Sequence, residues 1–364
     1  MTKKTKIITR IISIDERNLD LSKLHQAAEI IKNGGLVVFP TETVYGLGAN
    51  ALDADAVKKI YAVKGRPSDN PLIVHVAKTE DIYNYAHVPH GSAAERIIKT
   101  FMPSPLTLVL KKLNDKLNAT CALDTVAIRV PQNNTARRLI ELAGVPIAAP
   151  SANLSGKPSP TNAAHIVHDL SGDRGNCIVD MIICGENSDI GLESTVISFN
   201  EDDSLNILRA GFITREDLSD FVIHDKCESS TISESPASPG MKYKHYAPSS
   251  PLYILSGNDE DILNFVKTAA RDNSDKSIGF LCYTEVVEHF KGVENITAIP
   301  IGAKDNLREQ ARNLFDVLNK FNETDVNIIY SIEPNKTNIG EALYDRLIKA
   351  SGGEVIKISD SSML

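Results

Sequence analysis

The densest chemistry in the chain lies in twelve consecutive residues, KGRPSDNPLIVH, at Lys64–His75. Lys64 offers a movable point charge and Arg66 a planar fork of donors, and both suit phosphate oxygens. Asn70 adds an amide that can bind the edge of a nucleotide or a sugar. Because the residue before a proline avoids the helical region, we expect an extended backbone that projects Lys64 and Arg66 to one face. A solvated basic loop is the alternative.

A second polar segment, Pro40–Gly48, follows a short apolar run at 36–39 that predicts a buried strand. Thr41 and Thr43 place hydroxyl groups on either side of the Glu42 carboxylate, a set that could bind an ammonium and a hydroxyl group. Threonine and glycine also suit a capped turn after a strand, so a purely structural turn stays open.

Two titratable side chains interrupt apolar runs typical of strands. His75 is the last residue but one of the apolar run Leu72–Val76. A lone histidine in such a run is more often a core residue with ordinary hydrogen bonds than a ligand-binding residue. Arg129 lies between isoleucine and valine in the run 126–130, and a buried guanidinium needs a carboxylate or phosphate partner. A ligand-binding arginine and a structural salt bridge are equally open readings.

Small and polar residues follow a third predicted strand, at 145–149. The tract Ala148–Gly156 lets a ligand approach the backbone, and Ser151 and Asn153 can supply hydrogen bonds. A serine-rich loop before a helix is the alternative. There is no Gly-x-Ser-x-Gly elbow, which argues against a hydrolase serine.

Two further segments complete the set, Gly191–Ile197 and Leu208–Gly211. Arg209 stands at the end of a predicted strand before a glycine, a place suited to a phosphate, although a surface arginine would look the same. The sequence has no Walker A motif. The pairs at His87/His90 and His165/His168 lack a third ligand at a recognisable spacing, so no protein metal site is predicted.

Composition limits the remaining classes. A chain of 364 residues predicts two domains. A net charge of −8 argues against bulk nucleic-acid binding but allows a local basic pocket. The five cysteines form no Cys-x-x-Cys pair, which favours free thiols in a reducing cytoplasm. With no apolar run of the roughly 18 residues that a membrane helix needs, we expect a cytoplasmic protein without a membrane partner.

Periodicity predicts a mixed α/β domain over 1–224, a linker over 225–250 and a second α/β domain over 251–364. The linker is rich in Ser, Glu and Pro and ends in SPGMKYKHYAP at Ser238–Pro248. After 251 strands and helices alternate, which predicts a small parallel three-layer domain. Expected helices lie at 21–33, 54–61, 92–101, 135–143, 161–170, 259–270, 285–290, 307–321 and 339–350; expected strands lie at 36–39, 72–76, 106–110, 126–130, 145–149, 194–199, 205–208, 252–255, 277–282, 296–301, 326–330 and 354–358.

Five segments in order resemble the YrdC/TsaC family of L-threonylcarbamoyladenylate synthases: Pro40–Gly48, Lys64–Leu72, Ser151–Gly156, Gly191–Val196 and Arg209–Gly211. The linker motif and the α/β tail resemble the long, two-domain form. The resemblance implies a YrdC-like open, twisted α/β sheet with a concave basic surface, followed by a smaller Rossmann-like domain. It implies a nucleotidyltransferase that makes threonylcarbamoyl-AMP from L-threonine, bicarbonate or CO₂, and ATP with release of pyrophosphate, for tRNA modification beside the anticodon.

The same resemblance assigns roles to residues of this chain. A Lys-x-Arg and Ser-x-Asn signature would be catalytic: Lys64, Arg66, Ser151 and Asn153. The L-threonine site would be formed by Thr43, His75, Arg129, Ala149 and Ser194. The ATP site would be formed by Arg66, Asn70, Thr125, Ser151, Ser159, Arg209 and Tyr246. Tyr246 would act from a linker lid. Mg²⁺ is implied as a cofactor held largely by ATP, and a separate tRNA transferase as the downstream partner.

Two other functions compete with this reading. A concave basic surface could bind RNA, weakly and without catalysis. A related domain serves carbamoyl transfer in hydrogenase-cofactor maturation, but those proteins carry acylphosphatase and zinc-finger segments that this sequence lacks. Pyrophosphate release that requires both L-threonine and bicarbonate separates the synthase from the other two.

Overall fold

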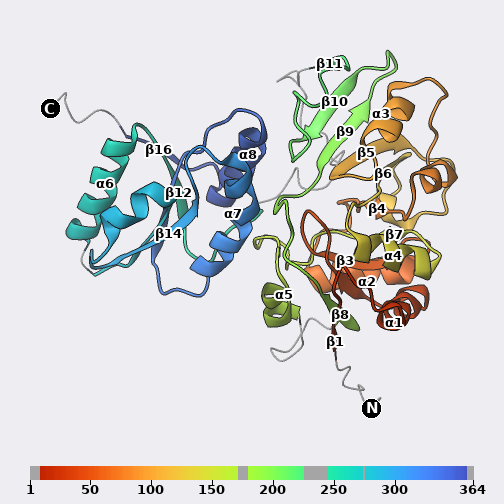
Figure 1. Ribbon diagram of the computed structural model, residues 1–364, viewed down its shortest axis with the longest axis horizontal. Coiled ribbons are helices and arrows are strands. Elements are labelled where there is room, and N and C mark those ends of the chain that lie inside the picture. Colours follow the sequence, from red (N-terminus) through yellow and green to blue (C-terminus); the bar gives the residue numbers. More distant parts are fainter. Residues whose placement is uncertain (1–8, 171–178, 225–244, 274, 359–364) are drawn as a thin grey trace. The chain divides into compact units, whose positions relative to one another are not determined.

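The computed structural model describes residues 9–170, 179–224, 245–273 and 275–358. The chain divides into two compact units (Figure 1). Unit 1 comprises residues 1–155, 159–189 and 193–242, and unit 2 comprises 243–364 together with 156–158 and 190–192. The division falls inside the predicted linker, most of which lies outside the described residues.

Unit 1 is built on one long mixed sheet, which in the described part of the chain has the order β1-β8-β2-β3-β7-β4-β6-β5-β9-β10-β11. Its strands are β1 (Arg10–Ser13), β2 (Val37–Phe39), β3 (Gly46–Asn50), β4 (Val74–His75), β5 (Leu106–Lys111), β6 (Thr125–Arg129), β7 (Ile147–Ala148), β8 (Met181–Cys184), β9 (Thr195–Phe199), β10 (Leu205–Arg209) and β11 (Ile223–His224). Its helices are α1 (Leu21–Lys32), α2 (Ala54–Lys64), α3 (Ala93–Phe101), α4 (Asn134–Ala143) and α5 (Ala163–Leu170), with short 3-10 turns η1 (Thr79–Asn84) and η2 (Asn118–Thr120).

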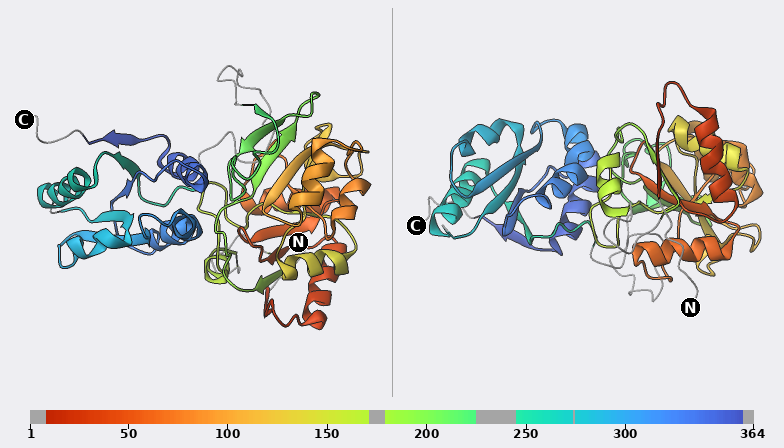
Figure 2. Two further views of the ribbon diagram at one scale, coloured as in Figure 1. Left: turned by 45° about the horizontal axis from the view of Figure 1, so that its top comes forward. Right: turned by 90° about the horizontal axis from the view of Figure 1, so that it is seen from below.

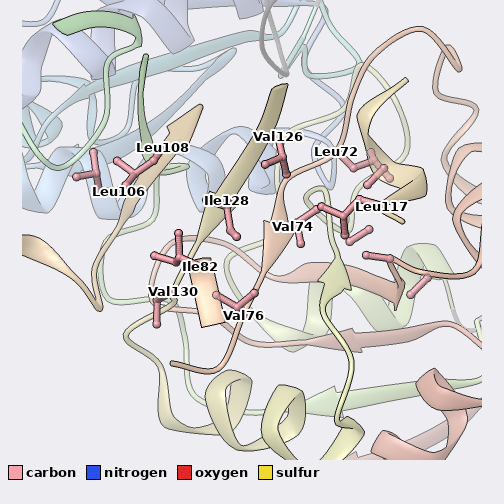
Figure 3. Packing of buried hydrophobic residues seen from close by; sticks show 14 of the residues in the cluster. Leu72, Val74, Val76, Ile82, Leu106, Leu108, Leu117, Val126, Ile128 and Val130 are labelled. Carbon is pink, nitrogen blue, oxygen red and sulfur yellow. The ribbon is translucent and has the colours of Figure 1, made fainter. Parts of the chain in front are cut away.

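Each face of this sheet packs against its own helices. One face packs with α2, α3 and α5 into a large apolar core that includes Leu108, Ile128 and Val74 (Figure 3). The opposite face packs with α1 and α4 through a separate cluster that includes Phe39 and Ile147. Figure 2 shows α1 and α4 from two further directions. Since neighbouring residues of a strand point to opposite faces, the residue after each core position on β4 and β6 is directed away from the large core.

Unit 2 contains a smaller sheet whose described strands are all parallel, in the order β14-β13-β15-β12-β16. The strands are β12 (Leu252–Ser256), β13 (Ile278–Tyr283), β14 (Ile296–Gly302), β15 (Ile328–Ile332) and β16 (Val355–Lys357). The connections are α6 (Asp259–Asp272), η3 (Thr284–Phe290), α7 (Leu307–Phe321) and α8 (Ile339–Ser351). The predicted three-layer α/β domain is confirmed.

Most predicted elements are present with ends shifted by a few residues. The clear exception concerns Lys64, which we expected in an extended segment. Instead α2 continues to Lys64, and Gly65 ends the helix in the left-handed conformation with φ of 61°. Glycine adopts this conformation without the penalty that a side chain brings, so Gly65 caps the helix after Lys64. Pro67 restricts only Arg66, the residue directly before it, and leaves Lys64 free to be helical. Strands β1, β3, β8 and β11 were not predicted.

Candidate active site

A first polar cluster forms where β4 and β6 lie side by side. His75 and Arg129 are paired in register on these parallel strands. Their neighbours Val74 and Ile128 belong to the large core, so His75 and Arg129 occupy the opposite face of the sheet. Both residues are buried, and each is 4% exposed. The predicted threonine-site residues His75 and Arg129 are therefore brought together.

The Arg129 guanidinium has two fixed partners from the loop after β2. Its Nη2 donates to Glu42 Oε1 at 2.6 Å and its Nη1 donates to Thr43 Oγ1 at 3.0 Å. Thr43 Oγ1 also lies 2.9 Å from Thr41 Oγ1. The second Glu42 oxygen accepts from the Asn133 backbone N–H at 3.3 Å. The structural salt bridge is present, and Arg129 Nε has no hydrogen-bond partner in the part of the chain that the structure describes. A ligand-binding role for Arg129 stays a prediction.

His75 is held as a neutral imidazole. Burial, with the nearby Arg129 charge second, lowers its pKa to about 3, while the backbone groups of Ile73 and Ile147 act in the opposite direction. The Phe39 ring meets the His75 ring edge-on, with 6.4 Å between the centroids. His75 Nδ1 is buried and has no hydrogen-bond partner in the described structure. The imidazole is thus a neutral polar group that can bind a ligand but does not carry charge near pH 7.

A second cluster connects β5, β9 and β10. Ser194 Oγ lies 2.7 Å from Thr107 Oγ1. Arg209 Nε and Nη2 donate to the Ser194 carbonyl oxygen at 3.1 and 2.9 Å, and Nη2 also reaches Ser194 Oγ at 3.1 Å. Predicted residues from the threonine set and the ATP set therefore touch at Ser194. Thr107 was not predicted as a site residue, although a lone threonine in the apolar run 106–110 is a sequence feature that could have indicated it.

The Lys-x-Arg and Ser-x-Asn signature residues also meet. Lys64 is buried, and its Nζ donates to the carbonyl oxygens of Ser151, at 2.5 Å, and of Asn153. Ser151 Oγ donates to Asn153 Oδ1 at 2.5 Å. Burial, with the Arg66 charge second, lowers the pKa of Lys64, while Glu193 acts in the opposite direction. In this structure Lys64 ties α2 to the Ser151–Asn153 loop.

The nucleotide-side residues lie along the loop between α2 and β4 and beyond β7. Arg66 donates from Nε to the Asn70 carbonyl at 3.3 Å and from Nη2 to the Pro71 carbonyl at 3.1 Å. The Asn70 side chain is 1% exposed, and neither amide atom has a hydrogen-bond partner in the described structure. Ser159 Oγ donates to Glu193 Oε1 at 2.7 Å. Glu193 was missed as a site residue, although it directly precedes Ser194.

The other predicted residues lie apart from these hydrogen bonds. Thr125 begins β6 and is half-buried, and Ala149 is buried with its N–H bonded to the Ile73 carbonyl at 2.9 Å. Tyr246 packs within unit 2, its ring 5.1 Å from that of Phe315, centroid to centroid. Its role at the nucleotide stays a prediction, and the rest of the lid motif before His245 lies outside the described residues.

Neither a metal cluster nor a membrane span is found in the described chain. No group of three or more His, Cys, Asp or Glu side chains in it could hold a metal ion. None of its helices is long and apolar enough to cross a membrane.

Comparison with known families and structures gives the class. Residues 29–211 match the Sua5/YciO/YrdC family model, described as "Telomere recombination". Residues 213–352 match the model described as "Threonylcarbamoyl-AMP synthase, C-terminal domain". Together, the Sua5/YciO/YrdC match over the open α/β sheet and the C-terminal domain match define the two-domain form of the Sua5/YrdC class of proteins.

The relatives give the particular family. The threonylcarbamoyl-AMP synthase of Bacillus subtilis (strain 168) is 42% identical over 94% of this chain and 97% of its own length. That of Pyrococcus abyssi is 40% identical over 96% and 100%. The crystal structure of P. abyssi Sua5 complexed with L-threonine matches with a TM-score of 0.84 at 39% identity, covering 96% of this chain and 100% of that one. The chain belongs to the threonylcarbamoyl-AMP synthase family, enzymes of the nucleotidyltransferase type.

Proposed function

We propose that this enzyme joins L-threonine, bicarbonate and ATP into threonylcarbamoyl-AMP and releases pyrophosphate. The observation that carries the proposal is a set of three buried polar groups without hydrogen-bond partners in the described structure: the Asn70 amide, His75 Nδ1 and Arg129 Nε. An unsatisfied buried polar group costs about 1–3 kcal/mol, so a set of them beside bonded site residues supports a ligand-binding role.

The threonine side of the proposal rests on the β4/β6 cluster. Arg129 Nε and His75 Nδ1 would bind the amino acid and the carbamate made from it, with Thr43 beside them. The related P. abyssi protein was solved with L-threonine, which supports the same class of ligand here. The threonine amine attacks the carbon of CO₂ or bicarbonate, and the carbamate forms with loss of a proton or of water.

The nucleotide side rests on Arg66, Asn70, Ser159 and Arg209, with Thr125, Ser151 and Tyr246 as further predicted contacts. A carbamate oxygen attacks the α-phosphorus of ATP, the new P–O bond forms, and the bond to the β-phosphate oxygen breaks to release pyrophosphate. No side-chain nucleophile is needed, so the residues act by positioning and by stabilising negative charge. Lys64 and Asn153 would fix the loop that carries Ser151.

The donors on this face are mainly cations, hydroxyls and amides, which fit ATP oxygens better than a metal ion. Mg²⁺ would therefore enter on the triphosphate and offset its charge, with the phosphates as its main ligands. The product, a mixed anhydride, would be consumed by a separate transferase that acts on tRNA beside the anticodon.

The proposal is tested by measuring pyrophosphate release with each substrate omitted in turn. We expect release only when ATP, L-threonine and bicarbonate are all present, and its loss in Arg66→Ala. Arg138→Ala is the matched control, since Arg138 is a half-buried arginine of α4 that pairs with Glu141 outside the site. RNA binding without any such release would support a binding module instead.

A further inference from the structure

The loop that carries Arg66 and Asn70 is held through its backbone carbonyl groups. The Asn70 carbonyl accepts from Tyr61 Oη at 3.1 Å as well as from Arg66. The Ser68 carbonyl accepts from Cys121 Sγ at 3.1 Å. Tyr61 Oη and Cys121 Sγ are themselves 3.2 Å apart. A phenol and a thiol thus lie in contact with each other, and each can donate to a backbone carbonyl of the segment whose side chains are proposed to bind ATP.

Both members of the pair are fixed by regular structure on either side of the loop. Tyr61 lies in the last turn of α2, where its carbonyl accepts from the N–H groups of Gly65 and Arg66. Cys121 directly follows η2 and has φ of 51°, in the left-handed region. The Ala119 carbonyl in η2 accepts from the Leu72 N–H at 2.9 Å, which fixes the far end of the same loop.

The chemistry of the pair suits a neutral hydrogen-bond donor role. Burial is the main cause that raises the pKa of the Tyr61 phenol and of the Cys121 thiol. Both groups therefore keep their hydrogens near neutral pH and can donate to the carbonyls of Asn70 and Ser68. These bonds hold the backbone at Asn70, whose amide is 1% exposed and has no hydrogen-bond partner in the described structure.

We propose that Tyr61 and Cys121 are positioning residues for the nucleotide, which hold the Arg66–Asn70 loop so that the Asn70 amide meets ATP. Neither residue needs to touch the ligand. The inference rests on the proposed function in one respect, that Arg66 and Asn70 face ATP. It predicts an effect on ATP that is not shared by L-threonine, whose site lies on β4 and β6.

The test uses the full chain with Tyr61→Phe, Cys121→Ala and Cys121→Ser, and measures the Kd for ATP by calorimetry and the KM values for ATP and L-threonine. Loss of one hydrogen bond is expected to raise the Kd and KM for ATP about three- to tenfold in Tyr61→Phe and in Cys121→Ala. The KM for L-threonine should change less than about twofold. Cys121→Ser keeps a donor and should show a smaller change than Cys121→Ala.

Two control variants separate positioning from general loss of stability. Tyr45→Phe also removes a buried phenol, one that bonds Gly185 N–H and the Glu186 carbonyl in the same unit. Cys184→Ala removes another half-buried thiol. Both should leave the ATP Kd at the wild-type value even if they lower the melting temperature as much.

An unchanged ATP Kd in both Tyr61→Phe and Cys121→Ala would overturn the inference, as would equal shifts for ATP and L-threonine. Failure of the proposed function looks different, because the wild-type protein itself would then release no pyrophosphate in the presence of threonine and bicarbonate. The Kd for ATP can still be measured in that case, and weaker ATP binding in Tyr61→Phe and Cys121→Ala would support the positioning role.

Discussion

The side chains of the site are oriented by partners that are themselves polar and buried. Arg129 shows this most clearly, because Glu42 and Thr43 accept from its two terminal nitrogens, while Nε has no hydrogen-bond partner in the described part of the chain. The strand pattern predicted that a buried arginine needs a partner, but not which one. Glu42 lies 87 positions away in sequence, and a local pattern holds no information about a contact of that range.

The Glu42–Arg129 ion pair gives a stability prediction. Glu42→Ala leaves a buried guanidinium without its carboxylate, so the free energy of unfolding should fall by about 3–5 kcal/mol. Urea denaturation measures this change. In the less buried pair of Arg138 and Glu141, with side chains 36% and 39% exposed, Glu141→Ala should by contrast cost about 1 kcal/mol or less. Equal losses in the two variants would contradict the buried, structural part of the Arg129 assignment.

The neutral His75 gives a pH prediction. Its folded pKa of about 3 lies below the usual value of 6.5, so between these pH values the unfolded chain binds the extra proton. His75 therefore contributes stability that is fully present above about pH 6.5 and is lost as pH falls toward 3.

Urea unfolding at pH 7.5 and pH 5.5 tests this, with His75→Gln as the reference. Over that range the wild-type protein should lose about 1.4 kcal/mol more than the variant. The same pH change in both proteins would mean that His75 titrates normally, and the neutral imidazole at the site would have to be abandoned.

At the scale of elements, the alternation of side chains along the strands places His75 and Arg129 on the face of the sheet opposite to the large core. On β4 and β6 the core positions Val74 and Ile128 could be predicted from sequence, and with them the opposite direction of His75 and Arg129. The short strands β3 and β8 could not, because a glycine-rich run and a four-residue run give weak periodicity. The helix end at Lys64 was predicted wrongly, since Gly65 caps the helix there and Pro67 restricts only Arg66, the residue directly before it.

The turn after β10 gives a prediction at this scale. A Cβ on Gly211 would lie 2.4 Å from the Thr195 backbone nitrogen and 2.8 Å from the Ser194 carbonyl carbon. Gly211→Ala must therefore displace the start of β9, where Ser194 contacts Thr107 and Arg209. We expect a lower melting temperature and a higher KM for L-threonine.

Gly144→Ala is the matched control for this change. Gly144 has φ of +66°, but a Cβ there would meet no atom within 4 Å. In Gly144→Ala the free energy of unfolding should fall only by the conformational cost of a left-handed alanine, about 1–2 kcal/mol, and the KM for L-threonine should not change. If Gly211→Ala behaved like Gly144→Ala, close packing at Gly211 would not position Ser194.

At the scale of the whole molecule, the sequence predicted two α/β units and the order of the polar segments, but not the order of strands. In unit 1, β1 pairs with β8 and β5 with β9, strands separated by more than 80 positions in the chain. Such pairings depend on the sum of packing across the sheet, which no local window records. They bring Thr107 beside Ser194, and for this reason Thr107 was missed from sequence.

We propose that the polar clusters of unit 1 and the Arg66–Asn70 loop serve one reaction with three substrates. The most direct measurement is mass spectrometry of the product made from ATP, L-threonine and ¹³C-bicarbonate. We expect one AMP-linked product that carries both the threonine and the ¹³C label, formed in step with pyrophosphate. Release of pyrophosphate without any AMP-linked product that contains threonine and the label would contradict it.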